Sequence, residues 1–257
     1  MDYSLKTVNK ALDILEQLSI KSEDSLTSLY KTMDMPKTTI FRLVNTLEKR
    51  GYILKNSSGS LSLGPRVMGL VSSTLRSGWI AELNKTAHPY MVDLRDLYED
   101  TVNLAIRIGD NLIYIDVVEG TYAMRFVELP GAIGSLHATA LGKTLLAYLD
   151  PIELKNILKR LTFEKLTPST IDNPDDFLYE LQLTKKQGFA LDCEGAVIGG
   201  SCIAVPILSD GKKPIAALSI ASARARMLDA RMESMKLSLM DACRNIEDIL
   251  YVKKFAF

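Results

Sequence analysis

One amphipathic segment near the N-terminus constrains this chain more than any other part of its sequence. Residues 34–53 read DMPKTTIFRLVNTLEKRGYI, and apolar residues recur there at the spacing of one helical face: Ile40, Leu43, Val44 and Leu47. The opposite face holds polar and cationic side chains: Thr38, Arg42, Asn45 and Lys49. In a DNA major groove Arg pairs with guanine, Asn with adenine, and Thr with phosphate or a thymine methyl group. An ordinary solvated helix has the same pattern, so the neighbouring residues must decide between the two interpretations.

The residues before this helix predict two further helices. Apolar residues recur at helical spacing over residues 5–19 and again after Ser25, which is a suitable N-cap. The connection to the third helix is short, and Pro36 suits its first turn, where the missing N–H is not needed. This spacing is typical of a helix-turn-helix.

The residues after the third helix predict a small β-hairpin. Gly51 is a C-terminal helix stop, and two strand-like runs, 52–55 and 60–63, flank a turn-rich segment. Three helices followed by a hairpin form a winged helix-turn-helix, in which the third helix enters the groove and the wing contacts phosphates or the minor groove. A winged helix used only for protein contacts is the alternative.

Composition predicts a cytoplasmic globular protein with two domains. The chain has 257 residues, of which 47% are hydrophobic. It has no apolar run long enough to span a membrane and no secretory signal pattern, so no membrane partner is expected. The cysteines (Cys193, Cys202 and Cys243) form no Cys-x-x-Cys pair and favour neither a disulfide framework nor a zinc site. We expect no metal and no cofactor.

The charge distribution favours local contact with DNA. Residues 1–66 hold ten Lys and Arg against seven Asp and Glu, whereas the remaining residues hold 21 against 24. A mildly basic head on a mildly acidic body is compatible with a DNA contact confined to the head. Overall neutrality argues against a protein that coats nucleic acid along its length.

The rest of the chain predicts a joining helix and an α+β body. Residues 65–77 are strongly apolar for a linker, so we expect this helix to pack against a partner helix, as at a dimer seam. Beyond it, strand hairpins alternate with helices, which favours an antiparallel sheet covered by helices. Helices are expected at 79–98, 140–149, 151–161, 174–187 and 229–252, and strands at 101–108, 112–118, 124–128, 201–208 and 214–221.

Several blocks of this sequence resemble the IclR family of bacterial transcriptional regulators, nearly from end to end. The blocks are, in order, ALDILE at 11–16, PKTTIFRL at 36–43, LHATALGKTLLA at 136–147, GFALDCE at 188–194, CIAVPI at 202–207 and IAALSI at 215–220. Each block is weakly specific, but their order and spacing are those of the family. The resemblance implies a winged helix-turn-helix domain over residues 1–64, a linker helix over 65–78, and a GAF-like domain over 79–257 that binds an effector and oligomerises.

The resemblance also implies partners and binding residues. Family members bind a small effector, commonly an organic acid, and are dimers or tetramers of dimers, so a homodimer or tetramer on a pseudo-palindromic double-stranded operator is expected. By motif position, the effector pocket involves Gly134, Ala140, Leu141, Asp192, Cys202, Ser219 and Ala221. The third helix and the wing are expected to contact DNA through Lys37, Thr38, Thr39, Arg42, Asn45, Lys49, Arg50 and Lys55.

One position departs from the relatives that bind small carboxylates. Those relatives have two serines in the last strand, separated by one residue. Here Ser219 matches the first of them, Ala221 stands at the position of the second, and Ser222 follows one residue later. The alternation of a strand turns Ser222 to the opposite face. One hydroxyl donor is therefore missing, which argues against a simple glyoxylate-like acid.

An enzyme that uses the same pocket is the alternative function. The sequence has no Gly-x-Ser-x-Gly elbow and no His-Glu-x-x-His helix. Gly142-Lys143-Thr144 lacks the glycine that a P-loop requires five positions earlier, where His137 stands. His137 could act as a general base, but the sequence names no partner for it. No catalytic residue is predicted, and the effector, the target genes and the sign of regulation, whether repressor or activator, stay open.

Overall fold

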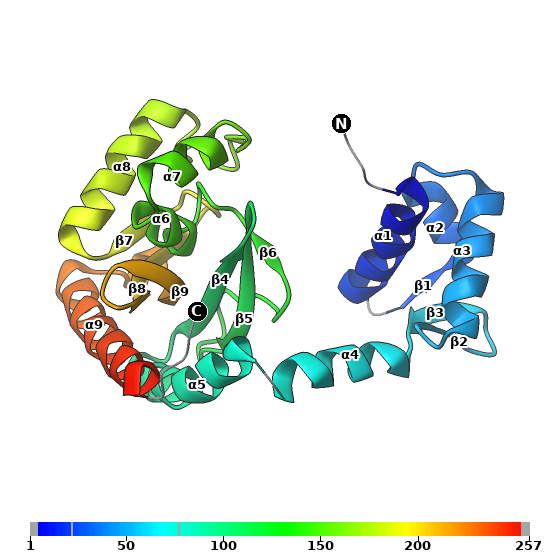
Figure 1. Cartoon of the computed structure of the whole chain (residues 1–257), viewed down its shortest axis with the longest axis horizontal. Helices are drawn as coiled ribbons and strands as arrows, with labels where there is room; N and C mark the ends of the chain where they lie inside the picture. The colour runs from blue at the N-terminus through cyan, green and yellow to red at the C-terminus, as the bar shows by residue number, and fades with distance from the viewer. Residues whose placement is uncertain (1–4, 22, 77, 253–257) are drawn as a thin grey trace. The chain divides into compact units, whose positions relative to one another are not determined.

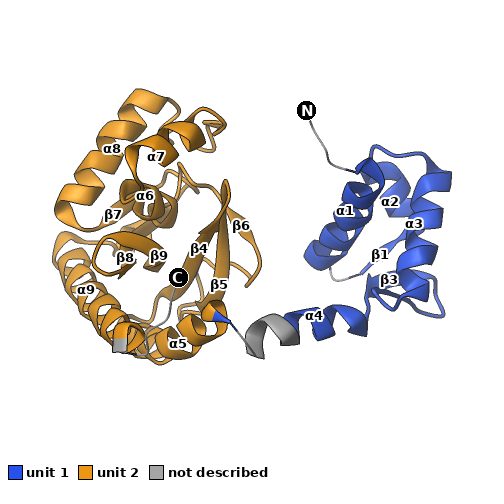
Figure 2. Ribbon diagram, viewed as in Figure 1, with its two compact units in different colours: residues 1–78 blue, residues 79–257 orange. Residues whose placement is uncertain are grey.

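The chain folds into two compact units, residues 1–78 and residues 79–257 (Figure 2). The computed structural model describes residues 5–21, 23–76 and 78–252. Each unit has hydrophobic cores of its own, so each is described by itself. The joining helix ends at Arg76, and its predicted last residue, Ser77, lies outside the described residues.

The first unit has three helices, a β-hairpin and a fourth helix (Figure 1). Its elements are α1 (Lys6–Lys21), β1 (Asp24–Ser25), α2 (Leu26–Thr32), α3 (Lys37–Lys49), β2 (Ile53–Lys55), β3 (Ser60–Leu63) and α4 (Pro65–Arg76). Strand β3 pairs antiparallel with both β1 and β2. The predicted winged helix-turn-helix is therefore present, with the unpredicted two-residue strand β1 added to its hairpin.

Local sequence explains where the helices of the first unit begin and end. The Ser25 hydroxyl accepts a hydrogen bond from the N–H of Ser28 (3.1 Å) and caps α2, as predicted. Pro36, predicted in the first helical turn, instead stands at the N-cap of α3, because its ψ of 137° is extended and only the next residue is helical. Gly51 adopts a φ of +76° after α3, a conformation that suits glycine.

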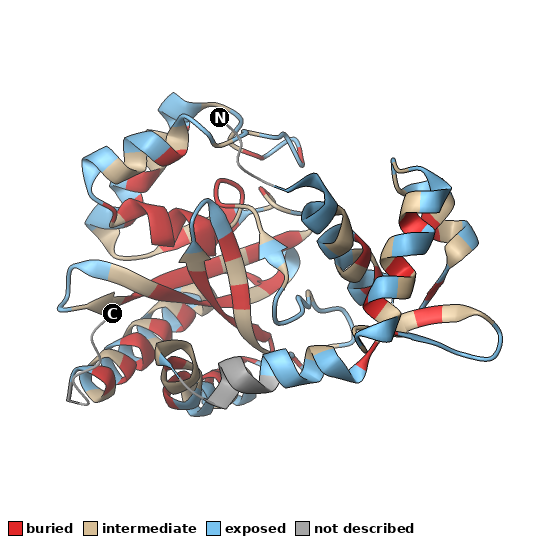
Figure 3. Ribbon diagram, turned by 45° about the vertical axis from the view of Figure 1, so that its right-hand side comes forward, coloured by how far each residue is buried: buried red, intermediate tan, exposed pale blue. Residues whose placement is uncertain are grey.

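The core of the first unit lies where the apolar stripes of its helices meet. Its fully buried side chains come from α1, α2, α3 and the hairpin, and they include Ile14, Leu18, Leu29, Ile40, Ile53 and Leu61. Of the stripe predicted on α3, Ile40, Val44 and Leu47 are buried and Leu43 is half-buried. The polar side of α3 is left at the surface (Figure 3).

The second unit is built on one antiparallel sheet of six strands in the order β6-β5-β4-β9-β8-β7. Its elements are α5 (Trp79–Tyr98), β4 (Thr101–Ile108), β5 (Asn111–Val118), β6 (Ile133–Gly134), α6 (Ala140–Ala147), α7 (Pro151–Leu158), α8 (Pro174–Gln187), β7 (Ala190–Cys193), β8 (Gly200–Ser209), β9 (Lys213–Ala223), the 3-10 turn η1 (Arg224–Arg226) and α9 (Asp229–Val252). The predicted α+β class is confirmed.

Helices cover both faces of this sheet, and each face has its own core (Figure 1). On one face, α5 and α9 pack over large branched side chains such as Leu104, Leu218 and Ile220. On the other face, α6 packs over the small side chains of Ala204 and Ala217, with α8 against it. Because these alanines take little room, α6 lies close to the strands.

Two parts of the sheet differ from the sequence prediction. Residues 124–128, predicted as a strand, have no regular structure. The sheet edge beside β5 is occupied instead by β6, and Tyr114 exchanges backbone hydrogen bonds with Gly131 and Ala132 just before it. Strand β7 is not predicted, because four residues are too few to show an alternating pattern. The other predicted elements are present, with ends shifted by a few residues.

Candidate functional site

An exposed stripe of mixed chemistry runs along α3 on the side away from the core. Thr38, Phe41 and Arg42 are exposed, and Asn45 is half-buried. These residues lie at i, i+3, i+4 and i+7, which places them on one helical face. The face therefore presents a hydroxyl, an aromatic ring, a guanidinium and an amide, which are groups that contact base edges in a major groove.

Sequence reasoning misses Phe41 as a member of this stripe. Its side chain is 48% exposed, although a ring of this size is ordinarily buried. The signal that finds it is positional, because an apolar residue stands between Thr38 and Arg42 on the polar face. An exposed ring there is suited to contact with a thymine methyl group.

The remaining residues predicted at the start of α3 lie beside the stripe. Lys37 is exposed, and its ammonium nitrogen lies 5.8 Å from the centre of the Tyr30 ring. Thr39 is half-buried. The structure thus brings Lys37 together with Thr38 and Arg42 in the first two turns of the helix.

Three predicted phosphate contacts lie elsewhere on the first unit. Lys49 and Arg50 are exposed at the C-terminal end of α3, and Lys55 is exposed at the end of β2. Arg50 also borders an apolar groove of about 670 Å³. This groove runs between α1, the end of α3 and α4, and its apolar lining includes Val8, Leu12, Leu15, Leu47 and Val67.

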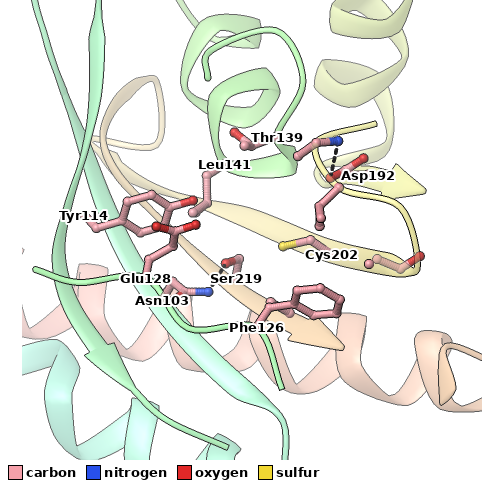
Figure 4. Close-up of a pocket in the computed structure, with 14 residues that line it drawn as sticks. Asn103, Tyr114, Phe126, Glu128, Thr139, Leu141, Asp192, Cys202 and Ser219 are labelled. Atoms are coloured by element: carbon pink, nitrogen blue, oxygen red, sulfur yellow. Dashed lines mark hydrogen bonds between the residues drawn. The ribbon is translucent and has the colours of Figure 1, made fainter. Parts of the chain in front are cut away.

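The second unit contains a cavity of about 160 Å³ on the α6 side of the sheet (Figure 4). Two rows of paired strand residues form its floor. One row joins Asp192, Cys202 and Ala221 across β7, β8 and β9. The other row joins Asn103 and Ser219 across β4 and β9. Since strand residues two apart share a face, all five lie on the side that the alanines leave open to α6.

The walls of the cavity come from α6, β5 and the irregular segment 119–132 that follows β5. They include Thr139 and Leu141 at the start of α6, Tyr114, Phe126 and Glu128. The residues that close the cavity at the start of β8 are Ala196, Val197, Gly200 and Ser201. Figure 4 shows the Glu128 carboxylate beside the hydroxyl of Tyr114. The cavity is therefore polar at its floor and on the side of β5.

A buried ion pair anchors segment 119–132 before it reaches the cavity. The fully buried carboxylate of Asp100 accepts hydrogen bonds from Arg226 (2.6 Å) and Arg231 (2.9 Å). The guanidinium of Arg226 also lies 4.0 Å from the centre of the Tyr122 ring and donates to the carbonyl oxygen of Met124 (3.2 Å). These contacts fix the segment just before its lining residues.

Asp192 is held in place by the backbone that follows β7. Its Oδ1 accepts the N–H of Gly195 (2.6 Å), and its Oδ2 accepts the N–H of Ala196 (3.4 Å). A side chain at position 195 would place its Cβ 2.7 Å from Oδ1, so glycine permits this close turn. Burial raises the pKa of Asp192, although the Gly195 N–H and the charge of Lys143 act in the opposite direction.

Burial also raises the pKa of the other ionisable groups that line the cavity. It raises the pKa of the Cys202 thiol to about 12, against a lowering hydrogen bond from Ser219. It raises the pKa of the Tyr114 hydroxyl, and the charge of Glu128 adds to this shift. Burial alone raises the pKa of the Glu128 carboxyl. At neutral pH the thiol and the phenol are therefore uncharged, and Cys202 lacks the thiolate that a nucleophile requires.

The N-terminus of α6 is the electropositive side of the cavity. The Thr139 hydroxyl caps the helix by accepting the N–H of Gly142 (3.0 Å). Within the described residues, the N–H groups of Ala140 and Leu141 have no hydrogen-bond acceptor. Because such groups carry partial positive charge, they favour an anion. None of the residues that line the cavity is Lys or Arg.

Two family models match this chain and together span most of it. The model described as "Bacterial transcriptional regulator IclR C-terminal" matches residues 80–248, and the model described as "IclR helix-turn-helix domain" matches residues 7–57. The chain belongs to the IclR family.

Relatives and solved structures of IclR regulators extend this match. The HTH-type transcriptional regulator KdgR of Dickeya chrysanthemi is 31% identical over 255 residues, which are 99% of this chain and 83% of that protein. The crystal structure of Thermotoga maritima IclR has a TM-score of 0.76 at 29% identity and covers 96% of this chain and 99% of its own. An IclR homologue from Microbacterium hydrocarbonoxydans, complexed with 4-hydroxybenzoate, has the same fold, with a TM-score of 0.81 at 21% identity over 96% of this chain and 100% of its own.

The IclR motifs identify most of the cavity floor. Five of the seven residues predicted from them line the cavity: Leu141, Asp192, Cys202, Ser219 and Ala221. Gly134 and Ala140 do not line it. Gly134 lies in β6, where an added Cβ would stand 3.0 Å from the ring of Tyr114, and Ala140 is fully buried in the core between α6 and the sheet.

The same motifs miss Asn103 on the floor and the wall residues outside α6, because those residues lie outside the quoted blocks. Asn103 belongs to β4, Tyr114 to β5, and Phe126 and Glu128 to the segment that the sequence predicts as a strand. A buried polar residue within an otherwise apolar strand is the signal that could have found Asn103, which is only 4% exposed. No comparable signal marks Glu128.

The structure shows the alternation predicted for the strand around Ala221, where this chain departs from the IclR pattern. Ser219 and Ala221 both line the cavity, and Ser222 does not. Ser222 pairs with Ser201 across β8 and is fully buried. Its hydroxyl has no hydrogen-bond partner within the described residues. The displaced serine therefore does not replace the missing hydroxyl.

In this IclR-family chain, His137 and Lys143 have hydrogen-bond partners within the fold. Nδ1 of His137 lies 3.0 Å from the Ser135 hydroxyl, and Nε2 lies 2.9 Å from the carbonyl oxygen of Glu164. Both ring nitrogens of His137 therefore have hydrogen-bond partners within the fold. Lys143 is buried and donates to Glu180 (3.2 Å) and to the carbonyl oxygen of Leu191 (2.7 Å).

The described residues contain neither a metal-binding cluster nor a membrane-spanning helix. No group of three or more His, Cys, Asp or Glu residues there is placed to hold a metal ion. No helix in the described part of the chain is both long and apolar enough to cross a membrane. KdgR of Dickeya chrysanthemi and the C-terminal family model both carry the description of a transcriptional regulator.

Proposed function

We propose that this chain is a sequence-specific transcriptional regulator whose affinity for DNA is set by a small organic acid. The observation that carries the proposal is the exposed stripe of Thr38, Phe41 and Arg42 on the third helix of a winged helix-turn-helix. In this fold the N-terminal part of that helix contacts base edges in the major groove. Such a regulator acts where bacterial DNA is, in the cytoplasm.

Within this proposal the DNA contacts divide by chemistry. Arg42 and Asn45 contact base edges, with Lys37, Thr38 and Thr39 beside them at the start of α3. The cations at the end of α3 and on the wing contact backbone phosphates instead: Lys49, Arg50 and Lys55. Phosphate contacts carry affinity and base contacts carry specificity.

We further propose that the regulator is a homodimer on a pseudo-palindromic operator, with half-sites about one helical turn apart. The apolar groove of the first unit supports a second copy of the chain as its occupant. Val8 and Leu12 on α1 are 50% and 49% exposed, and Leu70, which lines the groove from α4, is 56% exposed. A surface this apolar marks an association site. A two-fold pairing of α1 and α4 would hold two recognition helices at fixed spacing.

The cavity of the second unit is the proposed effector site. A carboxylate near the N–H group of Leu141, at the start of α6, would meet partial positive charge. Ser219 and Cys202 would supply small donors from the floor. A homologue of the same fold has been solved in complex with 4-hydroxybenzoate, a small carboxylic acid, which supports the class of ligand. The effector can change operator affinity by no more than the difference between its affinities for the DNA-binding and the non-binding conformations of the chain.

Selection of bound DNA tests the first part of this proposal. The full chain is incubated with a random DNA pool, with and without a mixture of organic acids, and enriched sequences are tested by gel shift. Arg42→Ala should lower affinity for the selected site by about 10- to 100-fold, whereas Arg244→Ala, which removes a 70%-exposed cation of α9, should have no effect. Unchanged specific binding by Arg42→Ala means that the proposed recognition face is wrong.

Two further variants test the dimer and the pocket. Leu12→Glu should shift the chain toward a monomer in sedimentation and weaken operator binding, and a dimer that survives this change excludes the groove as the seam. The double variant Asp192→Ala with Ser219→Ala should lose the response of the gel shift to the acid mixture. An unchanged response, in a variant whose melting temperature shows that it folds, means that the effector binds elsewhere.

A further inference from the structure

We infer that the effector of this cavity is a hydroxylated monocarboxylic acid, and that Asn103, Tyr114 and Glu128 select its hydroxyl groups. This inference rests on the proposed function, since it names the chemical class of ligand for the same site. It follows from which polar groups of the cavity already have hydrogen-bond partners and which do not.

The amide of Asn103 is the first of these groups. The residue is 4% exposed, and its Nδ2 donates to the Ser219 hydroxyl at a long distance of 3.4 Å. Its Oδ1 is buried and has no hydrogen-bond partner within the described residues. A buried acceptor without a donor costs free energy. Because Asn103 lines the cavity, a ligand hydroxyl can supply the donor.

Glu128 and Tyr114 form a second acceptor group on the wall of the same cavity. Both side chains line the cavity, and in the described part of the chain the pKa shifts of Glu128 and Tyr114 arise from burial and nearby charge, with no hydrogen bond to either group. Figure 4 shows their oxygens next to each other on the side of the cavity where Asn103 lies, and Asp192 on the opposite side. Glu128 is thus a carboxylate at a cavity whose lining supplies no cation.

The charges around the cavity limit the ligand to one acidic group. No Lys or Arg lines it, and the neighbouring cation Lys143 is already bonded to Glu180 and the carbonyl oxygen of Leu191. The start of α6 offers partial positive charge for one carboxylate. A second carboxylate would be buried near the carboxyl groups of Glu128 or Asp192, with no cation among the lining residues to pair with it. A dicarboxylic acid is therefore a poor ligand.

The same lining favours hydroxyl donors over an ammonium group. Both oxygens of Asp192 already accept backbone N–H groups, and burial raises the pKa of Glu128 and so disfavours its charged form. The other available acceptors are neutral: the amide of Asn103 and the hydroxyls of Tyr114 and Ser219. Neutral acceptors match hydroxyl groups better than they match a cation.

Cavity size sets the scale of the ligand. A cavity of about 150 Å³ is enough to hold a molecule the size of benzene, and this one measures about 160 Å³. A compact acid with a short hydroxylated chain fits this volume. Its acid group would lie toward α6 and its hydroxyls toward Asn103 and Glu128.

Calorimetric titration of the full chain with matched acids tests the inference. The pairs are glycerate with propionate, threonate with butyrate, and gluconate with hexanoate, and succinate and serine are added as a dicarboxylate and an ammonium ligand. At least one hydroxylated acid should bind about tenfold or more tightly than its unhydroxylated partner, which is the difference that one or two hydrogen bonds supply. Succinate and serine should not bind measurably.

Variants assign the preference to the named residues. Glu128→Leu and Asn103→Leu should each reduce the affinity ratio within a pair toward one, with little effect on the unhydroxylated acid. Val127→Ala is the matched control, because Val127 lies in the same segment and does not line the cavity. Glu128 is in an irregular segment, so its variant is expected to fold even where Asn103→Leu, in the buried strand β4, melts early.

The outcomes separate this inference from the proposed function. Equal affinity within every pair, or a ratio that Glu128→Leu leaves unchanged, overturns the inference and leaves an acid effector intact. Preferential binding of serine that depends on Glu128 overturns it in favour of a cationic ligand. Failure of every acid to bind or to change operator affinity overturns both the inference and the proposal of an acid effector.

Discussion

Arg226 lies with its Nη2 2.6 Å from a carboxylate oxygen of Asp100, a residue with no exposed surface, while its guanidinium covers the ring of Tyr122. The pair joins the turn after β9 to the start of β4, and through Tyr122 it also holds the segment that carries Glu128 toward the cavity. A single buried carboxylate thus supports both the fold and one wall of the site.

Asp100→Ala should destabilise the second unit by about 3 kcal/mol, because it leaves two arginines without their buried partner. The figure is at the low end of such losses, since Arg226 and Arg231 are 23% and 29% exposed and reach water. Denaturant unfolding followed by fluorescence measures the change. Arg125→Ala is the control: it breaks the exposed pair with Glu119 in the same segment and should cost less than about 1 kcal/mol. Equal losses in the two variants would contradict the anchoring role of Asp100.

The cysteines should differ in their reaction with a thiol reagent. Cys193 is exposed and should react rapidly with a disulfide reagent at pH 8. Cys202 should react slowly, because burial raises its pKa to about 12 and leaves almost no thiolate. Cys243 is buried, and burial raises its pKa as well. The reaction is followed by absorbance in the variants Cys193→Ser and Cys202→Ser. The fast phase should be lost in Cys193→Ser, and its loss in Cys202→Ser instead would refute the assignment.

Glu128→Gln should stabilise the ligand-free chain at neutral pH. The folded-state pKa of Glu128 is raised from 4.5, so the folded state holds its proton more tightly than the unfolded state does. The free energy of unfolding of the wild type therefore rises as the pH falls through the raised pKa of Glu128. Over this range the stability difference between the Gln variant and the wild type shrinks, and it vanishes below pH 4.5, the ordinary pKa of a Glu side chain. Urea unfolding of both proteins across this pH range measures the difference. A difference that grows toward acid pH would have the wrong sign.

Lys55→Ala should weaken DNA binding without changing which sequence is preferred. As a phosphate contact on the wing, Lys55 releases counterions on binding, so its loss should lower the slope of log affinity against log salt by about 1. Titrations of the selected operator and of an unrelated duplex at several salt concentrations measure both effects. Arg42→Ala should instead lower affinity mainly for the selected operator. If Lys55→Ala changed the sequence preference and Arg42→Ala did not, Lys55 would be the base contact and Arg42 the phosphate contact.

Periodicity was enough to predict the elements that are long and bury one face. The stripe of Ile40, Val44 and Leu47 defines α3, and the long apolar patterns give α5 and α9 with their observed ends. Short elements escape this reasoning. Strand β7 is ordered by pairing with β8 rather than by its own pattern, and residues 124–128 have strand-like composition but pair with no strand in the described part of the chain. Tertiary pairing decides both cases.

The cavity could be predicted only in part, and for a related reason. Its floor follows from strand register, so motif residues such as Asp192, Cys202 and Ser219 come together as expected. Its walls come from side chains whose place depends on the path of an irregular segment, as for Phe126 and Glu128. The proposed DNA contacts, the bounds of the domains and the dimer stay predictions.

The division of the chain after Gly78 has a consequence for how such proteins diversify. Every residue proposed to contact DNA belongs to the first unit, and every residue that lines the proposed effector cavity belongs to the second. Under the proposed function, a substitution that changes the preferred operator leaves the chemistry of the cavity intact. A substitution at Ala221 or Glu128 changes the preferred effector and leaves the proposed DNA contacts intact. New pairings of metabolite and gene can arise from either half alone.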